Sequence, residues 1–242
     1  MDRKVFIEKY GIHEDYYDFF NLELIVEINR IIEIVKKERY APEEQNIFKA
    51  LTTSINDAKV VIIGQDPYFQ LNAATGLAFE VGNLTSWDVK FKQRSLQNIV
   101  RNIYESYNNK RETFSVIRNE IISKHFNLQE PNILFKSWQR QGVILLNSYF
   151  TVKIDGGGNT GTSHKSLWEI FFCRLIKFIS EKNGNLIYFL WGNHAQNYKK
   201  YIVNGIIYES NHPSMAFGKE KQDFLNFEGF KKTKEIIEWI GN

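Results

Sequence analysis

The segment from Val60 to Tyr68, which reads VVIIGQDPY, constrains the fold more than any other part of the chain. Four consecutive β-branched residues end at Gly64 and are followed at once by Gln65, a carboxylate, a proline and an aromatic residue. A continuous Val/Ile run predicts a strand that is buried on both faces, as in a parallel sheet. Gly64 permits backbone angles that other residues resist, and Pro67 pushes Asp66 toward an extended backbone. The segment therefore predicts a core strand that presents Asp66 at its carboxyl end, where open α/β sheets bind ligands.

The composition predicts one folded domain over residues 1–242. Hydrophobic residues make up 43% of the chain, which is enough for a sizeable core, and 15% aromatic content argues against disorder. The single cysteine, Cys173, excludes an intramolecular disulfide framework and a cysteine-rich metal site. It fits a reducing compartment. Because the N-terminal residues also lack the apolar core of a signal peptide, we expect a cytoplasmic location.

The charge and hydropathy pattern narrows the possible partners. No apolar run approaches the roughly 20 residues of a membrane span, so no membrane association is expected. The net charge is +3 and the isoelectric point is near 8.7. This mildly basic balance permits a polyanionic partner but does not require one.

The order of apolar patterns predicts an α/β fold with a short, mainly parallel, four-stranded sheet flanked by helices. A helical part is expected over about 1–57, with its main helix at 17–37. A polar excursion over about 107–130 looks inserted between later elements. Further helices are expected after Ser95, from a capping box at Ser166, and at 194–204 and 228–240. The strand-like runs are 59–64, 142–152, 185–192 and 205–210.

Each strand-like run carries polar residues at or near its carboxyl end. Asp66 follows the first run, Asn147 lies late in the second, Asn193 follows the third and His212 follows the fourth. Because the carboxyl ends of parallel strands gather at one edge of a sheet, these residues predict a single shared pocket. The remaining histidines have no ligand-like spacing, so no metal site is expected. Gly156-Gly157-Gly158 is typical of a flexible loop and matches no nucleotide-binding fingerprint.

With these residues in place, the chain resembles the family 1 uracil-DNA glycosylases over roughly residues 59–232. The family's Gly-Gln-Asp-Pro-Tyr-His motif matches residues 64–69, except that Phe69 replaces the histidine. Met215-Ala216 stands where the family has Pro-Leu, and Lys90 to Arg94 replaces a proline-rich run. Asn193 stands where many members have a serine. The other matching motifs are Gly76 to Phe79, Gln141 to Asn147, Leu190 to Gly192 and His212 to Ser214.

The resemblance implies a three-layer α/β fold and removal of uracil from DNA, leaving an abasic site. It implies that Asp66 stabilises the sugar cation and positions water, and that His212 stabilises charge on the leaving base. Because no lysine occupies a nucleophile position in the motifs, no strand-cleaving activity is expected. The implied uracil-binding residues are Gln65, Tyr68, Phe79 and Asn147. The implied DNA-binding residues are Ser95, Asn193, Ser214, Met215, Ala216 and Phe217.

The resemblance also implies a monomer that acts on uracil in single- or double-stranded DNA, with no metal and no cofactor. It leaves open whether a protein inhibitor binds. Taken singly, Asp66 could form a turn, Asn147 could be a structural amide and His212 could be a surface residue. Two other functions stay open: a glycosylase of the same fold for another modified pyrimidine, and a DNA-binding or interaction module with weak catalysis.

Overall fold

The central sheet has four strands, all parallel, in the order β3-β2-β6-β7. The computed structural model describes residues 2–156, 160–218 and 220–241. Gly64 pairs with Asn147 in register, so the polar residues that end the two strands lie side by side. The predicted parallel α/β sheet is confirmed. Its strands are β2 (Val60–Gly64), β3 (Val143–Asn147), β6 (Ile187–Trp191) and β7 (Ile206–Ser210).

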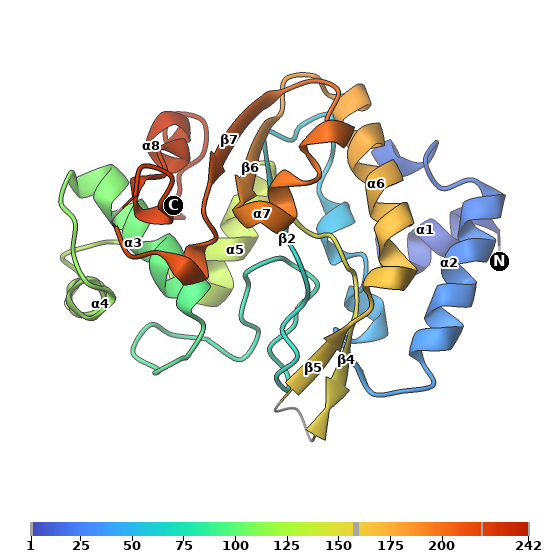
Figure 1. Cartoon of the computed structure of the whole chain (residues 1–242), viewed down its shortest axis with the longest axis horizontal. Helices are drawn as coiled ribbons and strands as arrows, with labels where there is room; N and C mark the ends of the chain where they lie inside the picture. Colours follow the sequence, from blue (N-terminus) through green and yellow to red (C-terminus); the bar gives the residue numbers. More distant parts are fainter. Residues whose placement is uncertain (1, 157–159, 219, 242) are drawn as a thin grey trace.

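Helices cover the sheet on both sides (Figure 1). In Figure 1, α1, α2 and α6 lie on one side of the sheet, whereas α3, α4, α5 and α8 lie on the other. One buried hydrophobic cluster runs from Phe6 to Trp239 and joins these layers. The helices are α1 (Arg3–Tyr10), α2 (Leu22–Val35), α3 (Arg94–Asn108), α4 (Phe114–Ile122), α5 (Pro131–Arg140), α6 (Lys165–Lys182), α7 (Gly192–Gln196) and α8 (Gly229–Thr233).

Several helix boundaries differ from the sequence expectations. The helix expected at 194–204 is α7 followed by a separate 3₁₀ turn at Lys199–Tyr201, and only α8 forms within 228–240. The capping box expected at Ser166 is wrong, because α6 begins one residue earlier and His164 occupies its N-cap. Of the three glycines expected to form a flexible loop, Gly157 and Gly158 lie outside the described residues.

A second, antiparallel sheet is built from β1 (Tyr40–Ala41), β4 (Val152–Asp155) and β5 (Thr160–Ser163). The single strand expected over 142–152 is therefore divided between two sheets. The chain turns away after Asn147, and buried Thr151 accepts a hydrogen bond from the indole of Trp168 at 2.7 Å. The contact satisfies the buried hydroxyl in the segment that joins the two sheets.

The polar excursion at 107–130 contains α4, which braces the loop that leads into α3. Arg118 donates to the backbone oxygen of Trp87 at 2.5 Å, and Glu130 accepts from the Trp87 amide at 3.0 Å. The rings of Phe91 and Phe114 meet edge to face at 5.4 Å. The excursion thus packs against the basic segment that stands where a proline-rich run was expected.

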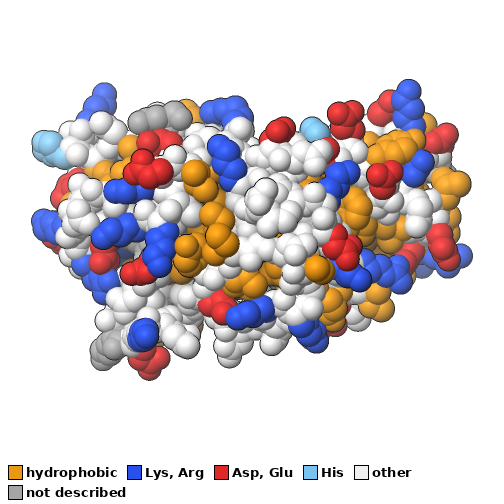
Figure 2. All heavy atoms as spheres, turned by 90° about the horizontal axis from the view of Figure 1, so that it is seen from above, with side chains coloured by type: hydrophobic (Ala, Val, Ile, Leu, Met, Phe, Trp, Pro, Cys, Tyr) orange, Lys and Arg blue, Asp and Glu red, His pale blue; other side chains and the backbone are white. Residues whose placement is uncertain are grey.

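The surface carries both signs of charge. Basic and acidic side chains are interspersed over the face shown in Figure 2, in keeping with the small net charge. Among the residues that the structure describes, no helix combines the length and the apolar character needed to cross a bilayer.

Candidate active site

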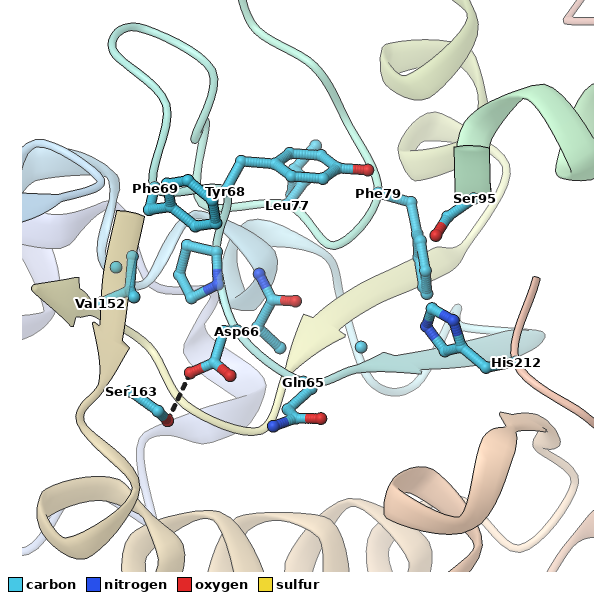
Figure 3. Close-up of a pocket in the computed structure, with 14 residues that line it drawn as sticks. Gln65, Asp66, Tyr68, Phe69, Leu77, Phe79, Ser95, Val152, Ser163 and His212 are labelled. Atoms are coloured by element: carbon cyan, nitrogen blue, oxygen red, sulfur yellow. Dashed lines mark hydrogen bonds between the residues drawn. The ribbon is translucent and has the colours of Figure 1, made fainter. Parts of the chain in front are cut away.

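A pocket of about 380 Å³ opens at the carboxyl edge of β2 and β3 (Figure 3). We call it the central pocket. It brings together seven of the predicted site residues, which come from five separate parts of the chain. Its lining residues are Gly64, Gln65, Asp66, Pro67, Tyr68, Phe69, Leu77, Phe79, Ser95, Asn147, Val152, Gly161, Ser163 and His212.

Gly64 and Asn147 form the floor of the pocket. Asn147 ends β3 and is only 6% exposed. A Cβ on Gly64 would collide with the amide oxygen of Asn147, so the glycine is required by close approach. Gly64 does not use the backbone freedom that a glycine permits, because it is the last residue of the extended strand β2. Its missing side chain gives the Asn147 amide room beside the pocket.

Asp66 lies on one wall, half-buried. Its Oδ1 accepts a hydrogen bond of 2.6 Å from the hydroxyl of Ser163 (Figure 3). Burial raises the pKa of Asp66, while hydrogen bonds from Ser163 and Gln65 and the nearby His164 act in the opposite direction. A half-buried carboxylate held by donors is suited to stabilise a positive centre or to orient a water molecule.

His212 lies on the opposite side, next to Phe79 in Figure 3. Its Nδ1 accepts from the backbone N–H of Ser214 at 3.2 Å and lies 2.7 Å from the Ser214 hydroxyl. Because an amide N–H can only donate, the neutral ring carries its proton on Nε2. Burial lowers the pKa of His212, which favours this neutral form. The ring is therefore suited to donate a hydrogen bond to charge that develops on a ligand.

Phe79 adopts a backbone conformation that is rare for a large side chain, with φ of 66°. Such a conformation costs about 1–3 kcal/mol and is found mainly where a site demands it. The Phe79 ring packs edge to face on Trp191 at 5.2 Å and lies 6.2 Å from the His212 ring. The strained backbone of Phe79 thus places an aromatic ring in the wall of the pocket.

Phe69 joins a small separate hydrophobic cluster. It packs with Ala74 against Ala41, Val152 and Ile154 of the antiparallel sheet. A Cβ on Gly161 would lie 2.5 Å from the Cβ of Phe69, so this glycine admits the ring. Phe69 therefore anchors the loop after β2 to the β4–β5 hairpin by apolar packing.

The residues expected to contact DNA are divided between two places. Ser95, in the first turn of α3, lines the central pocket. Asn193, Met215 and Phe217 line a neighbouring cavity of about 650 Å³, which we call the side groove. His212 is common to both cavities, and the others that line the side groove are Gly192, Asn211, Glu220 and Asp223.

The expectation that all four strand ends share one pocket is therefore wrong for Asn193. Helix α7 starts directly after β6 and carries Asn193, which is exposed, into the side groove. Ala216 is partly buried and packs against the main hydrophobic cluster. Ser214 binds His212 through both its hydroxyl and its amide.

The backbone of the loop after His212 is anchored by a buried carboxylate, that of Asp223. Asp223, which is 3% exposed, accepts from the backbone N–H groups of Phe217 and Gly218 at 2.7 and 2.8 Å. The Phe217 side chain is nevertheless 64% exposed and that of Met215 is 59% exposed. Two large apolar side chains are thus presented to solvent on an anchored backbone.

Sequence reasoning missed several contributors. Ser163 was not singled out, although Gly161 and Ser163 alternate along β5 and so share a face of that strand. Asn98 and Asn102 of α3 donate to the backbone oxygens of Pro213 and Phe224 at 2.6 and 2.9 Å. Their spacing of four on an apolar helix face was the available signal. They tie α3 to the loop that carries His212.

Comparison with known proteins gives consistent matches. The profile of the Uracil DNA glycosylase superfamily matches residues 52–239. The uracil-DNA glycosylase of Borrelia duttonii (strain Ly) is 35% identical over 207 residues, which cover 84% of this chain and 80% of that protein. The uracil-DNA glycosylase of Bacillus thuringiensis (strain Al Hakam) is 33% identical over 242 residues, covering 96% of this chain and 95% of that protein.

Solved structures show the same fold. Mimivirus uracil-DNA glycosylase is 22% identical, with a TM-score of 0.68, and the match covers 98% of this chain and 85% of that one. The wild-type UNG of Nitratifractor salsuginis is 17% identical, with a TM-score of 0.68, and the match covers 97% and 96%. A variant of mimivirus UNG in complex with UGI is 25% identical, with a TM-score of 0.64 and coverage of 86% and 72%.

Proposed function

Because this chain belongs to the uracil-DNA glycosylase family and is by homology a uracil-DNA glycosylase of DNA repair, we propose that Asp66 and His212 divide the hydrolysis between them. The bond between sugar C1′ and uracil N1 breaks, and its electron pair leaves with the base. The water oxygen then bonds to C1′, and a water proton neutralises the uracil anion. Free uracil and an abasic site result.

His212 acts on the leaving base. Negative charge that develops on uracil spreads to its carbonyl oxygens, and a neutral Nε2–H donor stabilises that charge without needing to transfer its proton. The support is the hydrogen bond from the Ser214 amide, which reserves Nδ1 as an acceptor. The lowered pKa of the buried ring keeps it neutral as the reaction proceeds.

Asp66 acts on the sugar and on water. Loss of the base leaves a sugar with the character of an oxocarbenium ion, which a nearby carboxylate stabilises electrostatically. The same carboxylate accepts a hydrogen bond from the attacking water and directs it to C1′. The half-buried position of Asp66 supports this role, because electrostatic interactions strengthen where water is partly excluded.

The observation that carries the proposal is the convergence of Asp66 and His212 with Asn147, Phe79 and Tyr68 in one pocket. The Asn147 amide offers both a donor and an acceptor to the edge of a flipped uracil. The Phe79 ring stacks on the base. Tyr68 closes the space at the C5 position, and the Gln65 backbone holds a carbonyl oxygen. Such a pocket reads a base only after the base has left the duplex.

DNA is bound by residues at the central pocket and at the neighbouring side groove. Ser95 and Asn193 bind the phosphates on either side of the flipped nucleotide, because hydroxyl and amide groups donate to phosphate oxygens. Ser214 joins them when its hydroxyl hydrogen turns from His212 Nδ1 to a phosphate, while its amide keeps Nδ1 an acceptor. Phe217 enters the gap that the flipped base leaves. Its support is the anchored backbone and exposed ring, whereas Ala216 is short and partly buried.

The test of the function is release of free base from oligonucleotides that carry one modified pyrimidine each. We expect uracil to be released from both single and double strands, faster than any 5-substituted pyrimidine. Faster release of a 5-substituted pyrimidine would favour a different glycosylase. Tight DNA binding without multiple turnovers would favour a binding module.

Tyr68→Ala is expected to reduce the discrimination against thymine by about 10–100-fold, since one methyl group in a tight pocket is worth that much. The Tyr68 ring is partly buried where it lines the pocket. The measurement compares kcat/KM for thymine and uracil in otherwise identical oligonucleotides. Tyr68→Phe is the matched control, because it keeps the ring and removes only the hydroxyl. Equal discrimination by wild type and Tyr68→Ala would refute the role of the ring.

Phe217→Ala is expected to lower kcat/KM on double-stranded substrate by about tenfold, because a vacated base stack loses its apolar filling. Excision from single strands should change little, since there is no stack to hold open. Met215→Ala, a change of similar size at an equally exposed neighbour, is the control. If Met215→Ala alone shows the duplex-specific loss, the assignment of Phe217 is wrong.

A further inference from the structure

Gly161 and Ser163 of strand β5 line the central pocket, and the hydroxyl of Ser163 faces Asp66. We propose that Ser163 is a positioning residue that orients the Asp66 carboxylate for attack by water. This inference rests on the role proposed above for Asp66. It assigns a function to the β4–β5 hairpin, which no motif of the sequence had marked.

The geometry gives Ser163 control over one carboxylate oxygen. Its hydroxyl donates to Asp66 Oδ1 at 2.6 Å (Figure 3), which is the short distance expected of a charge-assisted bond. The terminal torsion of an aspartate is broad and roughly two-fold, so the carboxylate plane is otherwise weakly determined. A fixed donor at Oδ1 therefore sets where Oδ2 points. Reaction rates depend steeply on such alignment of the reacting groups.

Ser163 can act as a fixed donor because its backbone is anchored on both sides. It pairs with Val152 of β4, and Val152 pairs in turn with Ala41 of β1. The next residue, His164, is buried and lies 2.8 Å from the Thr151 hydroxyl and 3.1 Å from a Glu38 oxygen.

The second side chain that hydrogen-bonds the carboxylate is less constrained. Gln65 also favours the charged form of Asp66, but its side chain has three rotatable bonds, whereas the Ser163 hydroxyl turns about one. Side chains of this kind lose much conformational freedom when they are held in one position. The Ser163 hydroxyl therefore determines the orientation of the Asp66 carboxylate, and Gln65 makes a smaller contribution.

Phe69 makes the contribution of Ser163 more important. Its ring has no hydrogen-bonding group and packs on Gly161, two residues before Ser163 on the same face of β5. Phe69 therefore offers neither Asp66 nor a water molecule a polar contact. On this wall, Gly161 admits the ring and Ser163 supplies the hydroxyl.

The hydrogen bond also bears on the charge of Asp66. The titratable groups that face Asp66 are His164, before α6, and Tyr149, after β3. Burial raises the pKa of Asp66, and the Ser163 hydrogen bond opposes this by favouring the charged form. Removing the hydroxyl should raise the pKa further. The charged form then disappears at a higher pH as the solution is acidified, so the acid limb of the rate profile moves to higher pH.

The experiment measures uracil release by the full-length protein under single-turnover and steady-state conditions across pH. Ser163→Ala is expected to lower kcat about tenfold with little change in KM, and to shift the acid limb to higher pH. Ser163→Thr keeps a hydroxyl at the same carbon and should restore both properties. Thr162→Ala is the matched control, because Thr162 donates to Asp155 at 2.6 Å on the opposite face of the same strand.

The outcomes separate this inference from the role of Asp66. If Ser163→Ala keeps the wild-type kcat and acid limb while Asp66→Asn is inactive, the positioning role is wrong and the role of Asp66 stands. A fully active Asp66→Asn would overturn both. Equal losses in Ser163→Ala, Ser163→Thr and Thr162→Ala would show a general effect of the hairpin and would also overturn the inference. Loss in Ser163→Ala with rescue by threonine supports it.

Discussion

Asp66→Asn is expected to lower the rate of uracil release by about 10²–10⁴-fold, the usual contribution of a positioned acid–base group. The asparagine has nearly the same shape, but it carries no charge to stabilise the sugar cation, and one carboxylate oxygen becomes an NH₂ group. Binding of uracil-containing DNA should persist, because Asp66 lies in the pocket wall and not on the rim. Single-turnover release and equilibrium DNA binding, measured on the same preparation, test this expectation.

Asp155→Asn is the matched control for this change. Asp155 of β4 also accepts a 2.6 Å hydrogen bond from a hydroxyl, that of Thr162. It belongs to the β4–β5 hairpin that carries Ser163, but it does not line the central pocket. It should keep wild-type activity. A comparable loss in both variants would mean that the hairpin had been disturbed, and near-normal release by Asp66→Asn would contradict the assigned chemistry.

His212→Leu is expected to lower kcat by about 10²–10³-fold, the typical cost of losing one donor to a developing anion. Leucine fills part of the same space but cannot donate to the leaving base. The loss should appear in kcat more than in KM, because the charge on the base develops only as the bond breaks. His125→Leu is a suitable control. His125 is exposed just after α4, contacts Ser123 and does not line the central pocket.

The pH dependence gives the same assignments an independent check. Below its lowered pKa, His212 becomes charged, and Asp66 becomes neutral below its raised pKa. Both changes occur as the pH falls, so activity should decline on the acid side and stay level near neutrality. In His212→Leu, the remaining acid limb should belong to Asp66. A rate that rises on acidification would contradict both assignments.

Strands β2 and β3 could be read from the sequence because each is a continuous apolar run with polar residues at its carboxyl end. Val60 to Ile63 and Val143 to Leu146 are buried throughout, as parallel strands require. The break after Asn147 could not be read, since Tyr149, Phe150 and Val152 continue the apolar pattern although the chain passes to another sheet. The strand ends where the backbone changes partner, from β2 before Tyr149 to β1 at Val152, and such pairing is not visible in the local pattern.

The central pocket was predictable for Asp66, Asn147 and His212, because each lies at the carboxyl end of a strand-like run and the motifs occur in the order of the family. The partnership of Asp66 with Ser163 was not, because 97 residues separate them and the register of the hairpin brings them together. The strained backbone of Phe79 was equally hidden, since φ is set by the surrounding packing and not by the residue type. Sequence points to the groups proposed to react, whereas the groups that hold them emerge from tertiary contacts.

The pairing of Gly64 with Asn147 has a consequence for how the enzyme fails when it is heated. The amides of Ser148 and Tyr149 donate to the backbone oxygens of Gly64 and Gln65 at 3.0 Å, so the pocket floor belongs to the central ladder. Amides of such a core exchange with solvent only through the largest openings of the native state. Recognition of the base should therefore persist up to the cooperative melting of the sheet, and deuterium uptake at Ser148 and Tyr149 should be among the slowest in the protein.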